Sequence, residues 1–281
     1  MIFAYAYGTA ASSASLDSVS LDRLVALLTL TSTWRGTANV ETHDAEWRKV
    51  GRRGLYREAK ARQVLQGWSA GTVAEVGLLT GHPDEPFAQS NVVSVRRAAG
   101  ESPGARALGM DLFVHCRLSL PEDSAPLLSQ LVPHLWGSLC CAYGIVHLTA
   151  RMLCASSELD AAANATCITL PGEVSDEHRR RIALERDIIL SRSHRFLGSK
   201  LLDIYWANYL TGDLRDRVRT RLEREPGSCD CWELTDIGDA TLLRVASRPM
   251  TAEDPEFVSL RSRMRRTLAD ECILAPWSGF V

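Results

Sequence analysis

The sequence predicts an α+β fold of two similar halves, each an antiparallel sheet with helices packed on one face. Three observations predict it. Residues 110–120 alternate strictly between two sets of side chains, which is typical of a strand with one buried face. Several other segments carry apolar residues at helical spacing. Both halves follow the order strand, helix, strands, helix, although no internal sequence repeat is visible.

The first half opens with a strand over residues 1–7. A helix follows, with Ser20 as its expected N-cap. Its apolar residues share one face: Leu21, Leu24, Val25 and Leu28. A second helix is expected over residues 55–65, where these residues share a face: Leu55, Ala59, Arg62 and Leu65.

Three strands and a long helix complete this half. The strands are expected at residues 73–80, 91–97 and 110–120, joined by turn-rich segments that suit an antiparallel meander. In the third strand Cys116 belongs to the apolar row, whereas His115 belongs to the opposite one. The helix is expected over residues 124–143, with Pro126 in its first turn, a kink at Pro133 and its end at Gly144.

The second half begins after a connector at residues 155–175 and a charge-dense segment at 176–192 that is expected to be partly helical. An aromatic strand is expected over residues 204–210, followed by a helix over 213–224 that buries Leu214, Val218 and Leu222. A hairpin over 231–246, with its turn at Gly238 and Asp239, and a final helix come next. Asp254 and Pro255 begin that last helix as cap and first residue, and it is expected to bury Phe257, Leu260, Met264 and Leu268.

The 281 residues suffice for one large core. We expect a single compact domain, or two closely packed halves at residues 1–154 and 165–281. A formal net charge of -2 argues against a general nucleic-acid binder, which needs a surplus of basic residues. The start of the chain lacks the basic region of a signal peptide, and the apolar run at 135–148 is too short and interrupted for a membrane span. We therefore expect a cytoplasmic protein without a membrane contact.

No motif in the chain indicates catalysis or a cofactor. The eight cysteines are expected to be reduced and mostly buried, because a chain of this length does not need disulfides. Cys229 and Cys231 lack the spacing of a zinc site, and no glycine-rich phosphate loop or nucleophile elbow is present. His134 and His147 lie in apolar surroundings, where a packing role is commoner. We expect no catalytic, metal or cofactor site, and an enzyme of unrecognised class using Cys and His is the alternative.

Charged clusters leave two interpretations open. The acidic residues at expected loops and hairpin ends either are solvated turn formers or form an acidic surface for a basic partner. These residues are Asp84, Glu85, Asp236 and Asp239. Arginines cluster on the outer sides of the helices at 213–224 and 255–272. A solvated face is the default for such arginines, and nucleic-acid contact is the weaker alternative.

The segment 204–210 carries the motif Tyr205-Trp206-Ala207-Asn208-Tyr209-Leu210 ahead of a helix, a hairpin and a closing helix. This arrangement resembles the C-terminal half of the immunity protein 52 family, bacterial immunity proteins of polymorphic-toxin and type VI secretion systems. The first half is similar in outline. The segments 35–62 and 176–195 have no counterpart in the family pattern.

The resemblance implies a cytosolic immunity protein that binds and neutralises a cognate protein toxin stoichiometrically, without turnover. Within the motif, Trp206 and Leu210 are expected in the core and Asn208 in a local hydrogen bond, and Tyr205 and Tyr209 share the opposite strand face. The toxin-binding surface is expected on loops, at Asp84 and Glu85 and at the hairpin end around Asp236 and Asp239. The oligomeric state and the toxin stay open.

Overall fold

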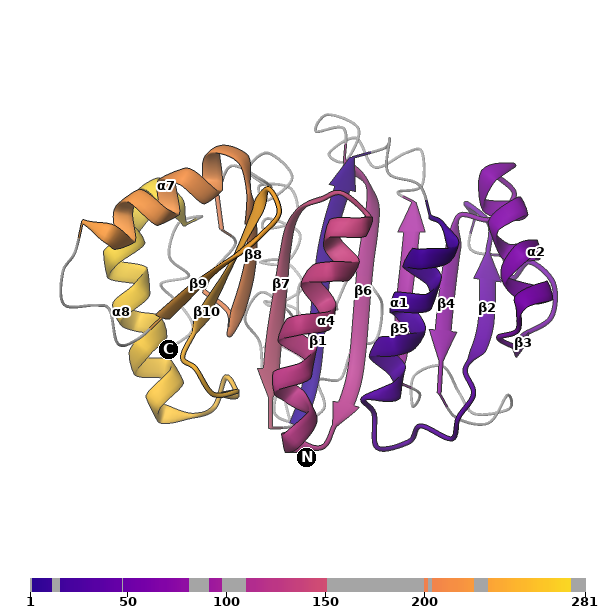
Figure 1. Ribbon diagram of the computed structural model, residues 1–281, viewed down its shortest axis with the longest axis horizontal. Coiled ribbons are helices and arrows are strands. Elements are labelled where there is room, and N and C mark those ends of the chain that lie inside the picture. The colour runs from indigo at the N-terminus through magenta and orange to yellow at the C-terminus, as the bar shows by residue number, and fades with distance from the viewer. Residues whose placement is uncertain are drawn as a thin grey trace, which may run out of the picture. The chain divides into compact units, whose positions relative to one another are not determined.

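The computed structural model describes residues 2–11, 16–46, 48–80, 91–97, 110–150, 200–201, 204–224 and 232–273. The chain divides into two compact units, residues 1–144 and 145–281. Asp84 and Glu85, the expected connector at 155–175, the segment 176–192 and four of the cysteines lie outside the described residues. The α+β class is confirmed: both units combine antiparallel strands with packed helices (Figure 1).

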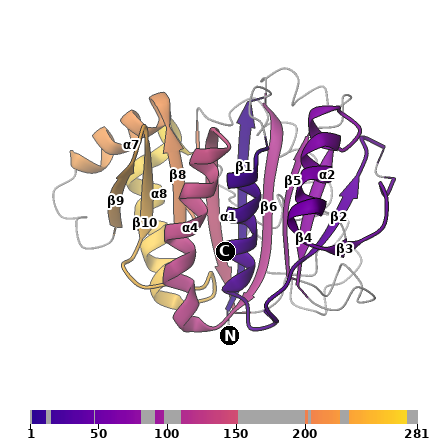
Figure 2. The ribbon, with the colours of Figure 1, turned by 45° about the vertical axis from the view of Figure 1, so that its right-hand side comes forward.

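The first unit holds most of the described strands. Its elements are β1 (Ile2–Ala11), α1 (Ser18–Thr29), β2 (Asn39–His43), β3 (Gly54–Leu55), α2 (Glu58–Ser69), β4 (Glu75–Leu79), β5 (Val92–Arg97), β6 (Met110–Leu120), the short 3₁₀ helix η2 (Glu122–Ser124) and α4 (Ala125–Ser138). The strand order is β3-β2-β4-β5-β6-β1, and each of these neighbours pairs antiparallel. Helices α1, α2 and α4 lie on one face of this sheet (Figures 1 and 2).

The second unit is built around a hairpin. Its elements are the greater part of β7 (Cys141–Thr149), β8 (Ala207–Thr211), α7 (Gly212–Glu223), β9 (Trp232–Ile237), β10 (Ala240–Val245) and α8 (Pro255–Cys272). The strand order is β7-β8-β10-β9. Helices α7 and α8 contact each other and β10, and the buried stripe of α7 is the expected one, Leu214, Val218 and Leu222.

The start and the buried face of α8 match the sequence prediction. The backbone N–H of Glu256 donates to the Asp254 carboxylate at 2.9 Å, and Pro255 is the first helical residue. The residues expected in the core are buried: Phe257, Leu260, Met264 and Leu268. Cap and apolar period are local signals, which is why the sequence alone located this helix.

Helix α1 corrects one detail of the sequence prediction. Its N-cap is Asp17, whose carboxylate accepts from the Ser20 backbone N–H at 2.7 Å, so Ser20 lies inside the first turn. Burial raises the pKa of Asp17, but the hydrogen bonds from Ser20 outweigh it and the pKa is lowered. The side chain of Ser20 is buried and lies 3.3 Å from the Ser138 hydroxyl of α4. Both residues are good caps, and only helix packing distinguishes them.

Two further elements differ from the prediction. Leu55 lies in the short strand β3 and is exposed, and α2 buries Val64 and Trp68 instead of the face expected around Leu55 and Ala59. The apolar segment up to residue 143 is not one helix: α4 ends at Ser138, and β7 begins at Cys141 after Cys140 adopts a φ of 52°. A fully buried strand shows no period-two pattern, so a local reading extends the preceding helix into it.

A tryptophan of α4 packs against two glycines of the strands below it. Trp136 is fully buried. A Cβ at Gly8 would lie 2.3 Å from its Nε1 atom, and a Cβ at Gly144 would lie 2.7 Å from Cδ2 and Cε2. Neither glycine has a positive φ, so the reason for glycine at both positions is space for the indole ring. The close approach fixes how α4 lies on the sheet of the first unit.

Candidate functional site

The aromatic segment that carries the family resemblance is a buried structural element. Tyr205 and Trp206 precede β8, and both are fully buried, as is Leu210. The amide of Asn208 bridges the turn: its Nδ2 donates to the Tyr205 carbonyl at 2.9 Å, and its Oδ1 accepts from the Tyr205 N–H at 3.3 Å. These bonds match the expected local role of Asn208 and satisfy backbone groups that burial removes from water.

Two more contacts hold this segment within the second unit. The indole Nε1–H of Trp206 donates to the Arg248 carbonyl at 3.1 Å. The ring of Tyr205 meets that of His147 edge to face, with centroids 5.6 Å apart. His147 is buried in β7, so it has the packing role expected for it, on a strand instead of near a helix. The motif is therefore part of the core of the second unit.

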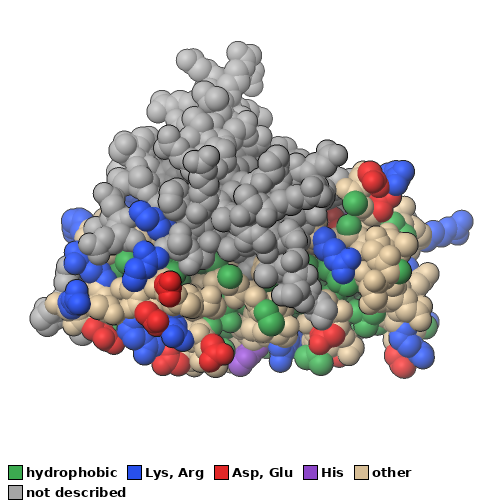
Figure 3. All heavy atoms as spheres, turned by 90° about the horizontal axis from the view of Figure 1, so that it is seen from above, with side chains coloured by type: hydrophobic (Ala, Val, Ile, Leu, Met, Phe, Trp, Pro, Cys, Tyr) green, Lys and Arg blue, Asp and Glu red, His purple; other side chains and the backbone are tan. Residues whose placement is uncertain are grey.

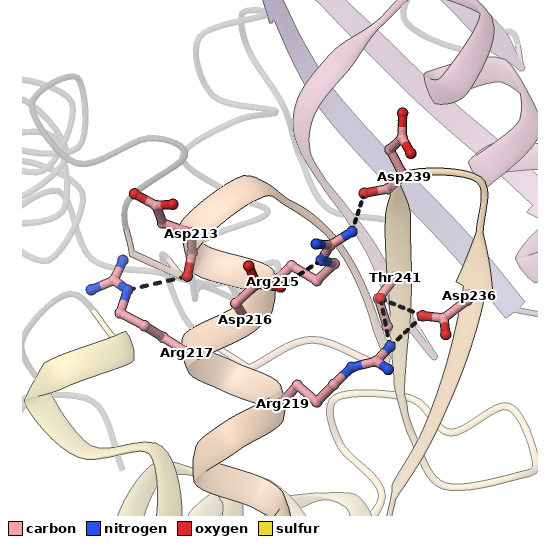
Figure 4. A network of polar contacts seen from close by, with 8 residues as sticks. All are labelled: Asp213, Arg215, Asp216, Arg217, Arg219, Asp236, Asp239 and Thr241. Carbon is pink, nitrogen blue, oxygen red and sulfur yellow. Dashed lines mark hydrogen bonds and ion pairs between the residues drawn. The ribbon is translucent and has the colours of Figure 1, made fainter.

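The hairpin end is the part of the expected partner surface that the structure describes. The two-residue turn at Gly238 and Asp239 joins β9 to β10, and Gly238 has the positive φ of 60° that such a turn requires. Figure 4 shows the start of α7 beside this turn. Asp236 and Asp239 are both exposed there.

Arginines of α7 hold the hairpin in place. The Arg215 guanidinium donates to the Asp239 carbonyl at 2.7 Å and to the Asp216 carboxylate at 2.8 Å (Figure 4). The Arg219 guanidinium pairs with the Asp236 carboxylate and donates to the Thr241 hydroxyl at 3.0 Å. That hydroxyl in turn donates to Asp236 at 2.7 Å. The carboxylate of Asp239 points away from Arg215 (Figure 4).

The same network determines the charge of the hairpin end. Hydrogen bonds from Thr241 and Arg219 lower the pKa of Asp236, so this carboxylate stays ionised well into the acidic range. Ion pairs at the protein surface contribute little to the free energy of unfolding, because solvent screens the charges. The network therefore positions the charge of the hairpin end more than it stabilises the fold.

The remaining α7 arginines also bond within the chain. Arg217 donates to the Asp213 carbonyl at 3.3 Å, and Arg221 donates to the Thr267 carbonyl of α8 at 2.9 Å. Over the described part of the surface in Figure 3, basic side chains lie beside acidic ones. This mixed pattern favours the solvated-face interpretation over a nucleic-acid surface, which gathers basic residues on one face.

A second charged cluster, absent from the sequence prediction, lies on β2 and β4 of the first unit. His43 and Glu75 are opposite each other in the register, with His43 Nδ1 3.6 Å from the Glu75 carboxylate, which is almost fully buried. His43 Nε2 lies 3.3 Å from Glu41, whose other oxygen pairs with Lys49 at 2.9 Å. The sequence shows His43 and Glu75 far apart, so only the strand register could have joined them.

This cluster gives a pH-dependent prediction. Burial lowers the pKa of His43, and Lys49 lowers it further, against the raising effects of Glu41 and Asp44. The folded chain then binds fewer protons than the unfolded chain, whose histidine pKa is about 6.5. The contribution of His43 to stability is therefore complete above that pH and is lost as the pH falls below it.

We expect the variant His43→Gln to lose less stability than the wild type when the pH is lowered. Urea unfolding of both proteins at pH 7.5 and at pH 5.5 measures it, because the difference in free energy between the two pH values should be smaller in the variant. His134→Gln is the matched control, since it removes an exposed histidine of α4. An unchanged pH dependence in His43→Gln would contradict the assignment.

Four of the cysteines lie among the described residues, and three of them are buried. Burial raises the pKa of Cys116 and of Cys141, so both stay protonated thiols in the core. Cys140 is exposed and Cys272 is buried. Within the described ranges, His, Cys, Asp and Glu side chains form no group of three or more that could hold a metal ion. The described helices also include none with the length and hydropathy of a membrane span.

The comparisons with known proteins inform the fold of this chain. No family model matches this chain, and no curated protein sequence matches it. The Pseudomonas aeruginosa T6SS protein PA0821 is similar in structure, with a TM-score of 0.58 and 10% sequence identity. The similarity covers 100% of this chain and 78% of that protein. At this identity it shows the fold alone.

Proposed function

We propose that this chain is an immunity protein that binds and neutralises a cognate toxin of a type VI secretion system in the cytoplasm. The observation that carries the proposal is the likeness over the whole chain to a T6SS protein. The aromatic motif at 205–210, which resembles the immunity protein 52 family, supports it independently. An immunity protein acts by occupying its partner, so its surface, and not a catalytic centre, performs the function.

The surface that we assign to the toxin includes the hairpin end. The carboxylates of Asp236 and Asp239 are exposed, and Arg215 and Arg219 fix the backbone and side chains around them. A prearranged acidic surface speeds association with a basic partner, because opposite charges steer the encounter before contact. Asp84 and Glu85 remain part of this proposed surface, and they lie outside the described residues.

The first test is co-expression with the adjacent open reading frame of the source genome. The neighbour expressed alone should arrest growth, and co-expression should restore growth and give a stable complex of fixed stoichiometry on co-purification. A harmless neighbour, or one that never associates with this chain, would refute the proposal.

Charge neutralisation at the hairpin end tests the surface. In the double variant Asp236→Asn with Asp239→Asn, association with the toxin at low salt should slow by roughly up to tenfold, and its salt dependence should flatten. Stopped-flow or surface plasmon resonance at several salt concentrations measures both. The matched control is Glu122→Gln with Asp123→Asn, which removes the same charge from two exposed residues of η2. Equal association rates for the two double variants would show that the toxin-binding surface lies elsewhere. The double variant Asp84→Asn with Glu85→Gln is compared with the same control.

A further inference from the structure

Strand β9 ends the order of the described strands in the second unit. Its one neighbour among them is β10, so one long side of β9 has no described strand beyond it. The strand has six residues and contains neither proline nor lysine, two of the features by which proteins block such edges. An edge of this kind can accept a further strand through its backbone groups.

The hairpin register shows which residues of β9 direct their backbone groups away from β10. The Val245 N–H donates to the Trp206 carbonyl at 2.8 Å, so Val245 directs its backbone away from β9. Antiparallel strands alternate, and Val245 is paired in register with Trp232. By the same alternation Leu234 and Asp236 direct their N–H and C=O groups away from β10, toward the side on which no described strand lies. Thr235, in contrast, exchanges its hydrogen bonds with Leu242.

The charges along this edge select the kind of partner. Asp236 pairs with Arg219, and Glu233 pairs with Arg244. The carboxylates are the outer members of both pairs: the Asp236 side chain is 62% exposed against 35% for Arg219, and Glu233 is 46% exposed against 21% for Arg244. An approaching chain therefore meets carboxylates first on both faces of the strand.

A second copy of this chain suits the edge poorly. Two β9 strands side by side would bring Glu233 and Asp236 of each copy close to the same acids of the other, and like charges across a strand pair are unfavourable. An extended segment with lysine or arginine on both of its faces meets the opposite condition. Its backbone pairs with Leu234 and Asp236, and its basic side chains approach Glu233 on one face and Asp236 on the other.

We propose that β9 is a docking edge that binds an extended, basic segment of the toxin as an additional strand. This inference rests on the proposed function and specifies the partner chemistry of the same hairpin. Backbone pairing supplies the affinity, and Glu233 and Asp236 select for positive charge. The hairpin end with Asp239 then guides the encounter, and β9 makes the lasting contact.

Amide hydrogen exchange, followed by NMR on this protein alone and in complex with the co-purified neighbour, tests the proposal. We expect exchange at Leu234 and Asp236 to slow by roughly tenfold or more on complex formation, while Thr235, already bonded to β10, changes less. Unchanged exchange at Leu234 and Asp236 in a stable complex would overturn the docking edge and leave the immunity function standing. Failure to form any complex would overturn both.

A pair of variants separates the backbone from the side chain. Leu234→Pro removes the outward N–H, a change that edge strands tolerate, whereas Leu234→Ala shortens the side chain and keeps the N–H. The proline variant should bind roughly tenfold more weakly than the alanine variant, the effect of one lost hydrogen bond. Equal affinities of two folded variants would overturn the proposal. Where the proline variant does not fold, the exchange pattern of the wild-type complex decides. Slow exchange at both amides in the free protein, with a mass that rises with concentration, would assign the edge to a second copy instead.

Discussion

Trp206→Ala should lower the free energy of unfolding by about 3–5 kcal/mol. The side chain is fully buried, so its loss removes a large apolar area from the core and leaves a cavity beside β8. The substitution also leaves the Arg248 carbonyl without the indole donor that now lies 3.1 Å from it. Urea unfolding monitored by circular dichroism measures the change.

A conservative variant separates the contribution of the apolar ring of Trp206 from that of its N–H group. Trp206→Phe keeps most of the apolar ring but loses the N–H group, so about 1–2 kcal/mol should be lost. The Trp206 carbonyl, which accepts from Val245, is unchanged in both variants. An alanine variant within 1 kcal/mol of the wild type would contradict the view that this motif is a core element.

Gly144→Ala should destabilise the first unit by about 3 kcal/mol, at the upper end of the cost of overpacking a core. Its Cβ would meet the fused ring of Trp136 at 2.7 Å, and the fully buried indole has no open side toward which to move. The midpoint of urea unfolding measures the loss.

Two controls isolate the steric cause. Gly54→Ala adds the same methyl group in β3, where the nearest atom that the new Cβ meets is the Arg52 carbonyl oxygen at 4.0 Å, and it should be nearly neutral. Trp136→Leu combined with Gly144→Ala should lose less than the sum of the two single changes, because leucine vacates the clashing ring position. Strict additivity would show that the cost at Gly144 has another origin.

Local signals account for the elements that the sequence predicted well. The alternation of residues 110–120 gives β6, and the stripe of Leu214, Val218 and Leu222 gives α7. Asp254 and Pro255 mark the start of α8, and Gly238 marks the turn of the hairpin. Each of these signals depends on residues within one or two turns of the chain, so no knowledge of the fold is needed to interpret them.

The candidate surface was predicted in part for the same reason. Acidic residues beside a glycine at a hairpin turn are exposed wherever the hairpin packs, so Asp236 and Asp239 could be selected from the sequence. The arginines of α7 could be placed on a helix face, but their bonding to the hairpin could not. Arg219 and Asp236 meet only because α7 crosses the hairpin in the folded chain.

The sequence by itself determined the α+β class, the amphipathic helices, the alternating strand and the hairpin, because their periods and caps are encoded within short segments. The tertiary structure alone decided that β7 is a strand, since a strand buried on both faces has no alternation. It also decided that Gly8 and Gly144 flank Trp136, that His43 lies opposite Glu75, and that β9 ends the described strands. These are relations between distant segments, and they arise only from strand register and packing, which no local pattern specifies.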